Sequence, residues 1–208
     1  NWIIGDPEGW PEDMQKYFFK PVGDLKNFDW QYEQHACVVC PNGDIMCFDN
    51  GQYRSKVKAK YIRNRDNFSR GVRYRIDTDK MEIEQVWQYG KELGQTFFSP
   101  YICNVEYYDE GHYLIHSGGI GWKDGYASDA LGAFINPKKD PSTDICSKTV
   151  EQKDGVWGIS WTNANRQKGV PIAIILEYGH ATGTGGWVRG RSYIPRAIQP
   201  IMDKIADD

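Results

Sequence analysis

Short runs in which apolar and polar residues alternate mark the first half of the chain. Residues 35–40 alternate in this way, residues 41–44 read Pro-Asn-Gly-Asp, and residues 45–48 are again apolar. Side chains of a β-strand point alternately to two faces, and an Asn-Gly pair between two such runs is typical of a tight turn. The pattern therefore predicts a β-hairpin over residues 35–48.

A second hairpin is predicted further along. Residues 70–76 and 81–89 alternate on either side of the polar segment 77–80. On one face of the second strand we expect Ile83, Gln85, Trp87 and Tyr89. Together the two hairpins supply four antiparallel strands, which is the content of one blade of a β-propeller.

Part of the pattern of the first predicted blade recurs later in the chain. An apolar run flanked by glycines at residues 43–51 recurs 68 positions later, at residues 111–119. Blade repeats usually span about 40 to 45 residues, so we place an insertion at residues 52–69. Strands of a second blade are predicted at residues 101–106, 112–116, 147–152 and 156–161. Two blades cannot close a ring, and the predicted fold class is therefore mainly β, a partial β-propeller of about two blades.

The C-terminal part of the chain has a different texture. Residues 170–178 are almost continuously apolar, residues 179–190 are rich in glycine, and residues 194–208 repeat apolar positions with helical period. We predict a small α+β module that ends in an amphipathic helix. The predicted domains are residues 1–156 and residues 157–208.

The composition is that of a globular protein, since 40% of the 208 residues are apolar. A net charge of −3 gives no basic footprint for nucleic acid. No apolar run reaches about 18 residues, and no export signal is visible, so no membrane span is expected. The chain begins at Asn1 and its first methionine is Met14. We expect an upstream portion; a signal there would imply a periplasmic or secreted protein.

The five cysteines are too few for a disulfide framework, and their odd number leaves at least one unpaired. Cys37 and Cys40 have a spacing found in metal and redox sites. Residues three apart on a strand point to opposite faces, however, so these two thiols cannot bind one ion. We interpret the cysteines as small core residues, with a cross-strand contact between Cys37 and Cys47 as the alternative. No metal site is predicted.

Several motifs of residues 23–156 resemble the C-terminal part of the bacterial arylsulfate sulfotransferases, the type that does not use PAPS. They are Gln-His-Ala at 34–36, Phe-Asp-Asn-Gly at 48–51, Arg-Gly-Val-Arg-Tyr-Arg-Ile-Asp at 70–77 and His-Ser-Gly-Gly at 116–119. The resemblance implies a β-propeller that moves a sulfuryl group from an aryl sulfate to a phenol through a sulfohistidine.

By motif position, the resemblance makes His116 the nucleophile, with His35 and Arg54 holding the sulfate. A neutral imidazole is a competent nucleophile near pH 7, and a guanidinium presents a rigid fork of donors to sulfuryl oxygens. His35 can neutralise or protonate the departing phenolate. No cofactor is required. Further pocket residues of the family come from earlier blades, so we expect the chain to be incomplete as an enzyme.

Residues 161–208 resemble a second family, the tail-completion or head-tail joining proteins of tailed bacteriophages. The motifs are Asn-Ala-Asn-Arg-Gln-Lys-Gly at 163–169, Leu-Glu-Tyr-Gly-His at 176–180 and Gly-Thr-Gly-Gly-Trp-Val-Arg-Gly-Arg at 183–191. That resemblance implies a virion-associated protein whose subunits assemble into a ring. The glycine-rich stretch lacks the Gly-Lys-Ser/Thr ending of a phosphate loop, and we interpret it as a flexible assembly loop.

The leading hypothesis is a sulfotransferase-like propeller fragment fused near residue 156 to a tail-completion-like module. Its partners would be aryl sulfates and phenols, without nucleic acid or membrane. The alternative is a structural protein that acts by homo-oligomeric ring assembly through residues 157–208.

Overall fold

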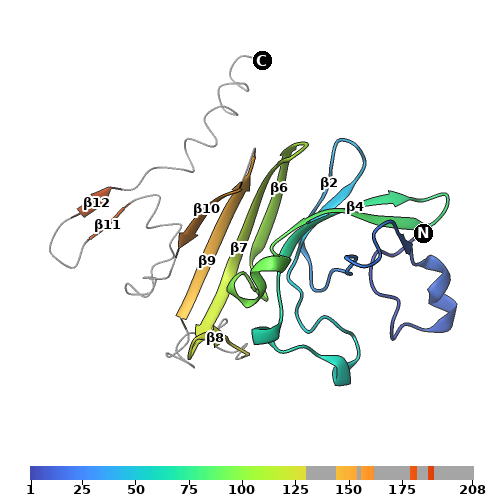
Figure 1. The fold of residues 1–208 in the computed structure, drawn as a ribbon, viewed down its shortest axis with the longest axis horizontal. Helices are drawn as coiled ribbons and strands as arrows, with labels where there is room; N and C mark the ends of the chain where they lie inside the picture. Colours follow the sequence, from blue (N-terminus) through green and yellow to red (C-terminus); the bar gives the residue numbers. More distant parts are fainter. Residues whose placement is uncertain (130–143, 154–155, 162–178, 182–186, 190–208) are drawn as a thin grey trace, which may run out of the picture. The chain divides into compact units, whose positions relative to one another are not determined.

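The structure, a computed structural model, describes residues 1–129, 144–153, 156–161, 179–181 and 187–189. Its backbone contacts divide the chain into two units, Asn1–Thr162 and Asn163–Asp208. Nearly all described residues belong to the first unit, which is mainly β (Figure 1). The boundary that the sequence placed at residue 156 remains a prediction.

The first sheet contains the two predicted hairpins. Its strands lie in the order β1-β5-β4-β3-β2, and only the β1–β5 pair is parallel. Strands β2 to β5 therefore form the four-stranded antiparallel meander that the alternating pattern predicted. The bounds are β1 Lys20–Val22, β2 His35–Val39, β3 Ile45–Asp49, β4 Arg70–Asp77 and β5 Glu82–Tyr89.

The second sheet is also an antiparallel meander, in the order β10-β9-β7-β6, with β8 paired to β7. All four predicted strands are present. The glycine pair after His116 does not end β7, which continues to Lys123. The bounds are β6 Cys103–Asp109, β7 His112–Lys123, β8 Tyr126–Ala127, β9 Asp144–Gln152 and β10 Val156–Trp161.

The helices among the described residues are short 3-10 turns, because no segment there has a sustained helical pattern. Two of them lie in the loop between β3 and β4, where the sequence predicted an insertion. The bounds are η1 Glu12–Tyr17, η2 Lys58–Lys60, η3 Asn64–Asp66 and η4 Lys91–Thr96. No helix in the described ranges has the length and hydrophobicity needed to cross a membrane.

Two apolar clusters cover the two faces of the first sheet. One lies between the sheets and joins Met46 and Phe48 to Phe97, Val105 and Ile115. The other packs the opposite face against the N-terminal segment, and its buried members are Phe19, Cys47, Val72, Tyr74 and Ile83. The first sheet is thus buried on both sides.

One predicted face is wrong. Ile83 belongs to the N-terminal cluster, whereas Trp87 and Tyr89 pack in the cluster between the sheets. The cause is a β-bulge: Arg73 pairs with Trp87 and Tyr74 with Gln85, which leaves Val86 unpaired. An extra residue reverses the alternation on either side of it.

In the second unit, β11 Gly179–Ala181 pairs antiparallel with β12 Trp187–Arg189. Parts of the stretch interpreted as a flexible loop therefore form strands, which corrects that prediction. The predicted apolar run at residues 170–178 and the terminal helix at residues 194–208 lie outside the described residues.

A buried carboxylate ties the first unit together. Asp49, at the end of β3, is fully buried and its Oδ2 accepts hydrogen bonds from Arg70 Nε at 3.0 Å and Arg54 Nη2 at 3.1 Å. Its Oδ1 accepts one from the Tyr32 backbone N–H at 3.0 Å. Arg70 reaches on to the carbonyl of Asp29 at 2.8 Å. One anion thereby holds β3, β4 and the N-terminal segment.

We expect Asp49→Asn to lower the free energy of unfolding by about 3 to 5 kcal/mol, because two guanidiniums would stay buried without their counter-charge. Urea titration measures this loss. Asp77→Asn is the control, since Asp77 ends β4 with a side chain that is 39% exposed, and its charge partner is the exposed Lys80. A loss for Asp49→Asn no larger than that of the control would contradict the prediction.

Candidate active site

His35 opens β2, and a buried asparagine fixes its ring. The Asn50 amide lies 2.7 Å from His35 Nδ1 through its Oδ1, while its Nδ2 donates to the carbonyl of Ser99 at 2.7 Å. Because the Asn50 Nδ2 donor is already used, Oδ1 accepts a hydrogen bond from His35 Nδ1–H. This leaves His35 Nε2 for an external group, as an acceptor in the neutral ring or a donor in the imidazolium.

Arg54 lies in the loop after β3 with its backbone in the left-handed region, at φ 43°. Its Nε donates to Asn67 Oδ1 at 2.9 Å and its Nη2 to the Phe68 carbonyl at 2.8 Å and to Asp49. Nη1 has only a long contact of 3.4 Å to the Trp30 carbonyl. Burial lowers the pKa of Arg54, and the Asp49 carboxylate opposes that shift. The guanidinium is thus an anchor of this loop, and Nη1 makes the longest of its contacts.

His116 sits on β7 directly opposite Thr149 of β9. Its Nδ1 lies 2.9 Å from Thr149 Oγ1, and burial lowers the pKa of the imidazole. When Nδ1–H donates to the hydroxyl, Nε2 carries the lone pair and the ring is poised as a nucleophile. Thr149 was not among the residues predicted from the sequence, because its place beside His116 follows from the pairing of β7 with β9.

A group of polar residues lies between the segment of His35 and that of His116; it consists of Asn50, Ser99 and Cys103. Asn50 Nδ2 also reaches Cys103 Sγ at 3.2 Å, and the Ser99 hydroxyl accepts from the Gly119 N–H at 2.7 Å. Burial raises the pKa of Cys103 to about 11, so this thiol stays protonated near neutrality. A short polar path therefore leads from His35 to the glycines that follow His116.

Gly118 lies next to that polar path, and there is no room for a side chain at its position. A Cβ at this position would lie 2.1 Å from the Ile102 carbonyl oxygen and 2.9 Å from His116 Nε2. Only glycine lets β7 pass so close to the chain before β6, and any side chain here would displace the imidazole.

Two of the three predicted site residues lie beside one segment of the chain. His35 and Arg54 flank the same segment, since His35 bonds to Asn50 and Arg54 Nη2 lies 2.5 Å from a Cβ placed on Gly51. His116 lies on β7 of the other sheet, and its Nε2 lies beside Gly118. Within the described part of the chain, no hydrogen bond joins any two of the three side chains. Their assignment as a catalytic set remains a prediction.

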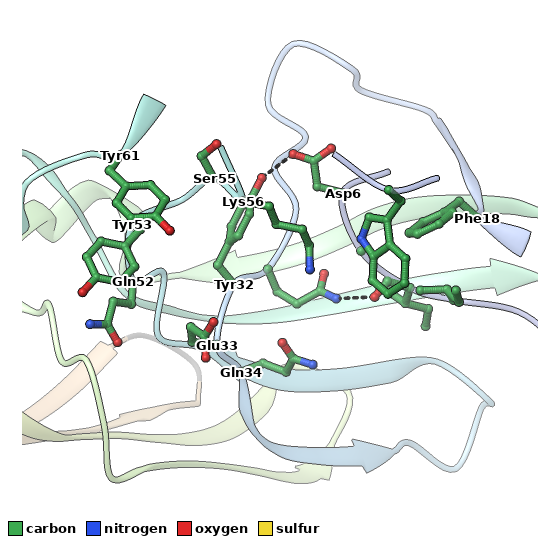
Figure 2. Close-up of a pocket in the computed structure, with 15 residues that line it drawn as sticks. Asp6, Phe18, Tyr32, Glu33, Gln34, Gln52, Tyr53, Ser55, Lys56 and Tyr61 are labelled. Atoms are coloured by element: carbon green, nitrogen blue, oxygen red, sulfur yellow. Dashed lines mark hydrogen bonds between the residues drawn. The ribbon is translucent and has the colours of Figure 1, made fainter. Parts of the chain in front are cut away.

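A cavity of about 570 Å³ adjoins the same loops. Figure 2 shows Tyr32, Tyr53, Tyr61 and Lys56 around it. Tyr32 donates its hydroxyl to Asp6, and burial together with this carboxylate raises its pKa well above the ordinary value. The Tyr32 backbone N–H binds the Asp49 carboxylate that also holds Arg54, so the cavity wall and the arginine share one anchor.

Two buried polar atoms of cavity-lining residues lack partners in the described structure, the Trp10 Nε1 donor and the Gln31 Oε1 acceptor. Exchanging the oxygen and nitrogen positions of the Gln31 amide would not supply the missing partner, because Nε2 already donates to the Ile4 carbonyl at 2.9 Å. One of these atoms is a donor and the other an acceptor, and both belong to residues that line the cavity. No group of three potential metal ligands occurs among the described residues.

Comparison with known proteins now adds to this geometry. The model of the family described as arylsulfotransferase (ASST) matches residues 1–169. The chain belongs to this family. The arylsulfate sulfotransferase AssT of Escherichia coli O6:H1 is 30% identical over 132 residues, which are 57% of this chain and 22% of that protein. The enzyme of the same name from Lelliottia amnigena is 31% identical over 120 residues, or 51% and 20% of the two chains.

The match thus spans about a fifth of the length of these relatives. It confirms the first resemblance and extends it, from residues 23–156 to residues 1–169. The extension overlaps the beginning of the segment 157–208, which the sequence assigned to a tail-completion-like module. The comparisons give no support to that second resemblance, to ring assembly or to a fusion.

We expect His116 to titrate with a midpoint below 6.5, because its ring is partly buried and has no carboxylate partner. Since the folded pKa lies below the unfolded value, its contribution to stability is present above pH 6.5 and is lost as the pH falls through the folded pKa. NMR titration of the imidazole signals measures the midpoint, and His116→Gln identifies the resonance. A midpoint at or above 6.5 would contradict the assignment.

Proposed function

We propose that this chain supplies the nucleophile and part of the sulfate clamp of an arylsulfate-dependent sulfotransferase. The observation that carries the proposal is the His116 ring, bound through Nδ1 to Thr149 with its Nε2 beside Gly118. Family membership supports the reaction class, and the names of the two relatives support the donor class.

In the proposed reaction, His116 Nε2 attacks the sulfur of an aryl sulfate, the S–O bond to the ring breaks, and the electron pair leaves with the phenolate. The N–S bond makes the imidazole cationic, and Nδ1–H keeps its hydrogen bond to Thr149. An acceptor phenolate then attacks the sulfur and restores His116. His35, held through Asn50, presents Nε2–H to the departing phenolate when its ring is charged.

In this proposal Arg54 does not present its whole guanidinium group to the sulfate. All three of its nitrogens contact the protein, but Nη1 makes only the long contact of 3.4 Å to the Trp30 carbonyl, so in this proposal Nη1 turns to the sulfuryl oxygens while the other contacts keep the guanidinium rigid. A preorganised donor costs little reorganisation when charge develops in the transition state.

We further propose that the two meanders are neighbouring blades of a β-propeller. Each has four strands in antiparallel sequence order, and an apolar cluster lies between the two sheets. In that arrangement, the residues that the family contributes from other blades would complete the pocket.

The cavity beside Tyr32 is proposed to hold the aryl ring of a phenol. Its aromatic side chains supply the stacking surface, and Trp10 Nε1 and Gln31 Oε1 supply the unpaired donor and acceptor for one hydroxyl. Lys56 lies 5.0 Å from the Trp10 ring centre and adds a positive charge at this wall.

Incubation with 4-nitrophenyl sulfate and no acceptor should add one SO₃ group to the peptide that contains His116. Peptide mass spectrometry detects this adduct even when turnover is slow. With phenol present, His116→Asn should lower 4-nitrophenolate release by on the order of 10³-fold. His112→Asn is the control, because His112 lies on the same strand but pairs with Glu151 at 2.8 Å. A sulfated residue other than His116 would overturn the nucleophile assignment.

Trp10→Phe should weaken binding of phenol by roughly 5-fold, since it removes the N–H donor and keeps an aromatic ring. Calorimetry with phenol measures the change. Trp2→Phe serves as the control because Trp2 is exposed and does not line the cavity. Equal affinities for both variants would remove the cavity from the proposal without touching His116.

A further inference from the structure

Two cysteines face each other across the first hairpin. His35 pairs with Phe48, and Val38 pairs with Met46, so Ala36 and Cys37 together oppose Cys47. The extra residue is a β-bulge whose first member, Ala36, has a positive φ of 52°. The bulge therefore sets Cys37 beside Cys47.

The two thiols also lie on the same face of the sheet. Ala36 and Val38 pack against the cluster between the sheets, so Cys37 points to the opposite face. Cys47 lies in the N-terminal cluster on that opposite face. The two side chains are hydrogen-bonded to each other.

The two cysteines differ in solvent exposure. Cys37 is exposed at the sheet edge, because β2 is the outermost strand, whereas Cys47 is 2% exposed. The hydrogen bond from Cys47 lowers the pKa of Cys37 to about 7, while that bond and burial raise the pKa of Cys47. Near neutrality, Cys37 is thus the thiolate that meets a reagent, and Cys47 is the protonated partner behind it.

Cys40 is a poor partner despite its spacing. It packs in the cluster between the sheets, on the face opposite to Cys37, and burial raises its pKa. Cys37 and Cys40 therefore point to opposite faces, as strand alternation predicted, and the predicted alternative, a cross-strand contact between Cys37 and Cys47, is present.

We propose that Cys37 and Cys47 form a redox-active dithiol that closes to a cross-strand disulfide when the protein meets a disulfide oxidant. The Cys37 thiolate attacks the oxidant's S–S bond, forms a mixed disulfide and releases one thiolate. The Cys47 sulfur then loses its proton and attacks Cys37 Sγ, which expels the second thiolate. Two protein thiols are oxidised, and one oxidant disulfide is reduced to two thiols.

The bond would fasten an edge strand. β2 is paired on one side only and begins with His35, two residues before Cys37. A covalent link to β3 restricts opening of this strand, and therefore of the segment that binds Asn50. The inference rests on the hairpin alone and does not depend on sulfuryl transfer.

The test treats the folded, reduced protein with oxidised glutathione, followed by alkylation and peptide mapping without reduction. We expect a Cys37–Cys47 linked peptide in wild type and in Cys40→Ser, and none in Cys37→Ser. Cys47→Ala should instead accumulate the mixed disulfide between Cys37 and glutathione. Circular dichroism confirms that each variant is folded.

Alkylation kinetics give a second readout. The rate at Cys37 should rise with pH around a midpoint near 7 in wild type. The midpoint should move upward in Cys47→Ala, which lacks the hydrogen bond. A stable glutathione adduct on wild-type Cys37, a bond to another cysteine, or no reaction of Cys37 would each overturn the proposal.

Discussion

The first unit depends on one buried anion. Asp49 is fully removed from solvent and receives two guanidinium groups and one backbone N–H. An isolated carboxylate at such a depth would be strongly destabilising, and so would either arginine. Each of the three charges is tolerable only because the others are present, so β3, β4, the following loop and the N-terminal segment must assemble together. Arg70 extends the same network to Asp29 and Gln85.

The candidate site grows from that anchor. Asp49, Asn50 and Gly51 are consecutive, and they fix Arg54, His35 and the path of the loop respectively. Arg54 therefore has a structural role, and Nη1 makes the longest of its hydrogen bonds, 3.4 Å to the Trp30 carbonyl. His116 depends on different contacts, because its orientation comes from Thr149 and from the glycines of β7. Asn50 and Ser99 connect the segment that holds His35 with the glycines that follow His116.

In the hairpin of β2 and β3, one extra residue determines which face of the sheet each side chain points to. The bulge at Ala36 keeps Val38 in the apolar cluster and turns Cys37 toward Cys47. The bulge at Val86 works in the same way on β5, where it lets a single strand serve the two opposite clusters. Both of these bulges lie in the first sheet, whose two faces contact the two apolar clusters. A strand with unbroken alternation could not have placed these side chains.

The sequence by itself determined the eight strands of the two meanders, their hairpin order and the mainly β class, because alternation and Asn-Gly or Asp-rich turns act over a few residues. Its motifs also identified the family and the segments that carry His35, Arg54 and His116. Only the tertiary structure decided the parallel strand β1, the two bulges, the burial of Arg54 beneath Asp49, and the partners Asn50 and Thr149. The strand β1 and the partners Asn50 and Thr149 depend on contacts between residues 15 to 62 positions apart, and local periodicity carries no information about which distant side chains will share one buried space.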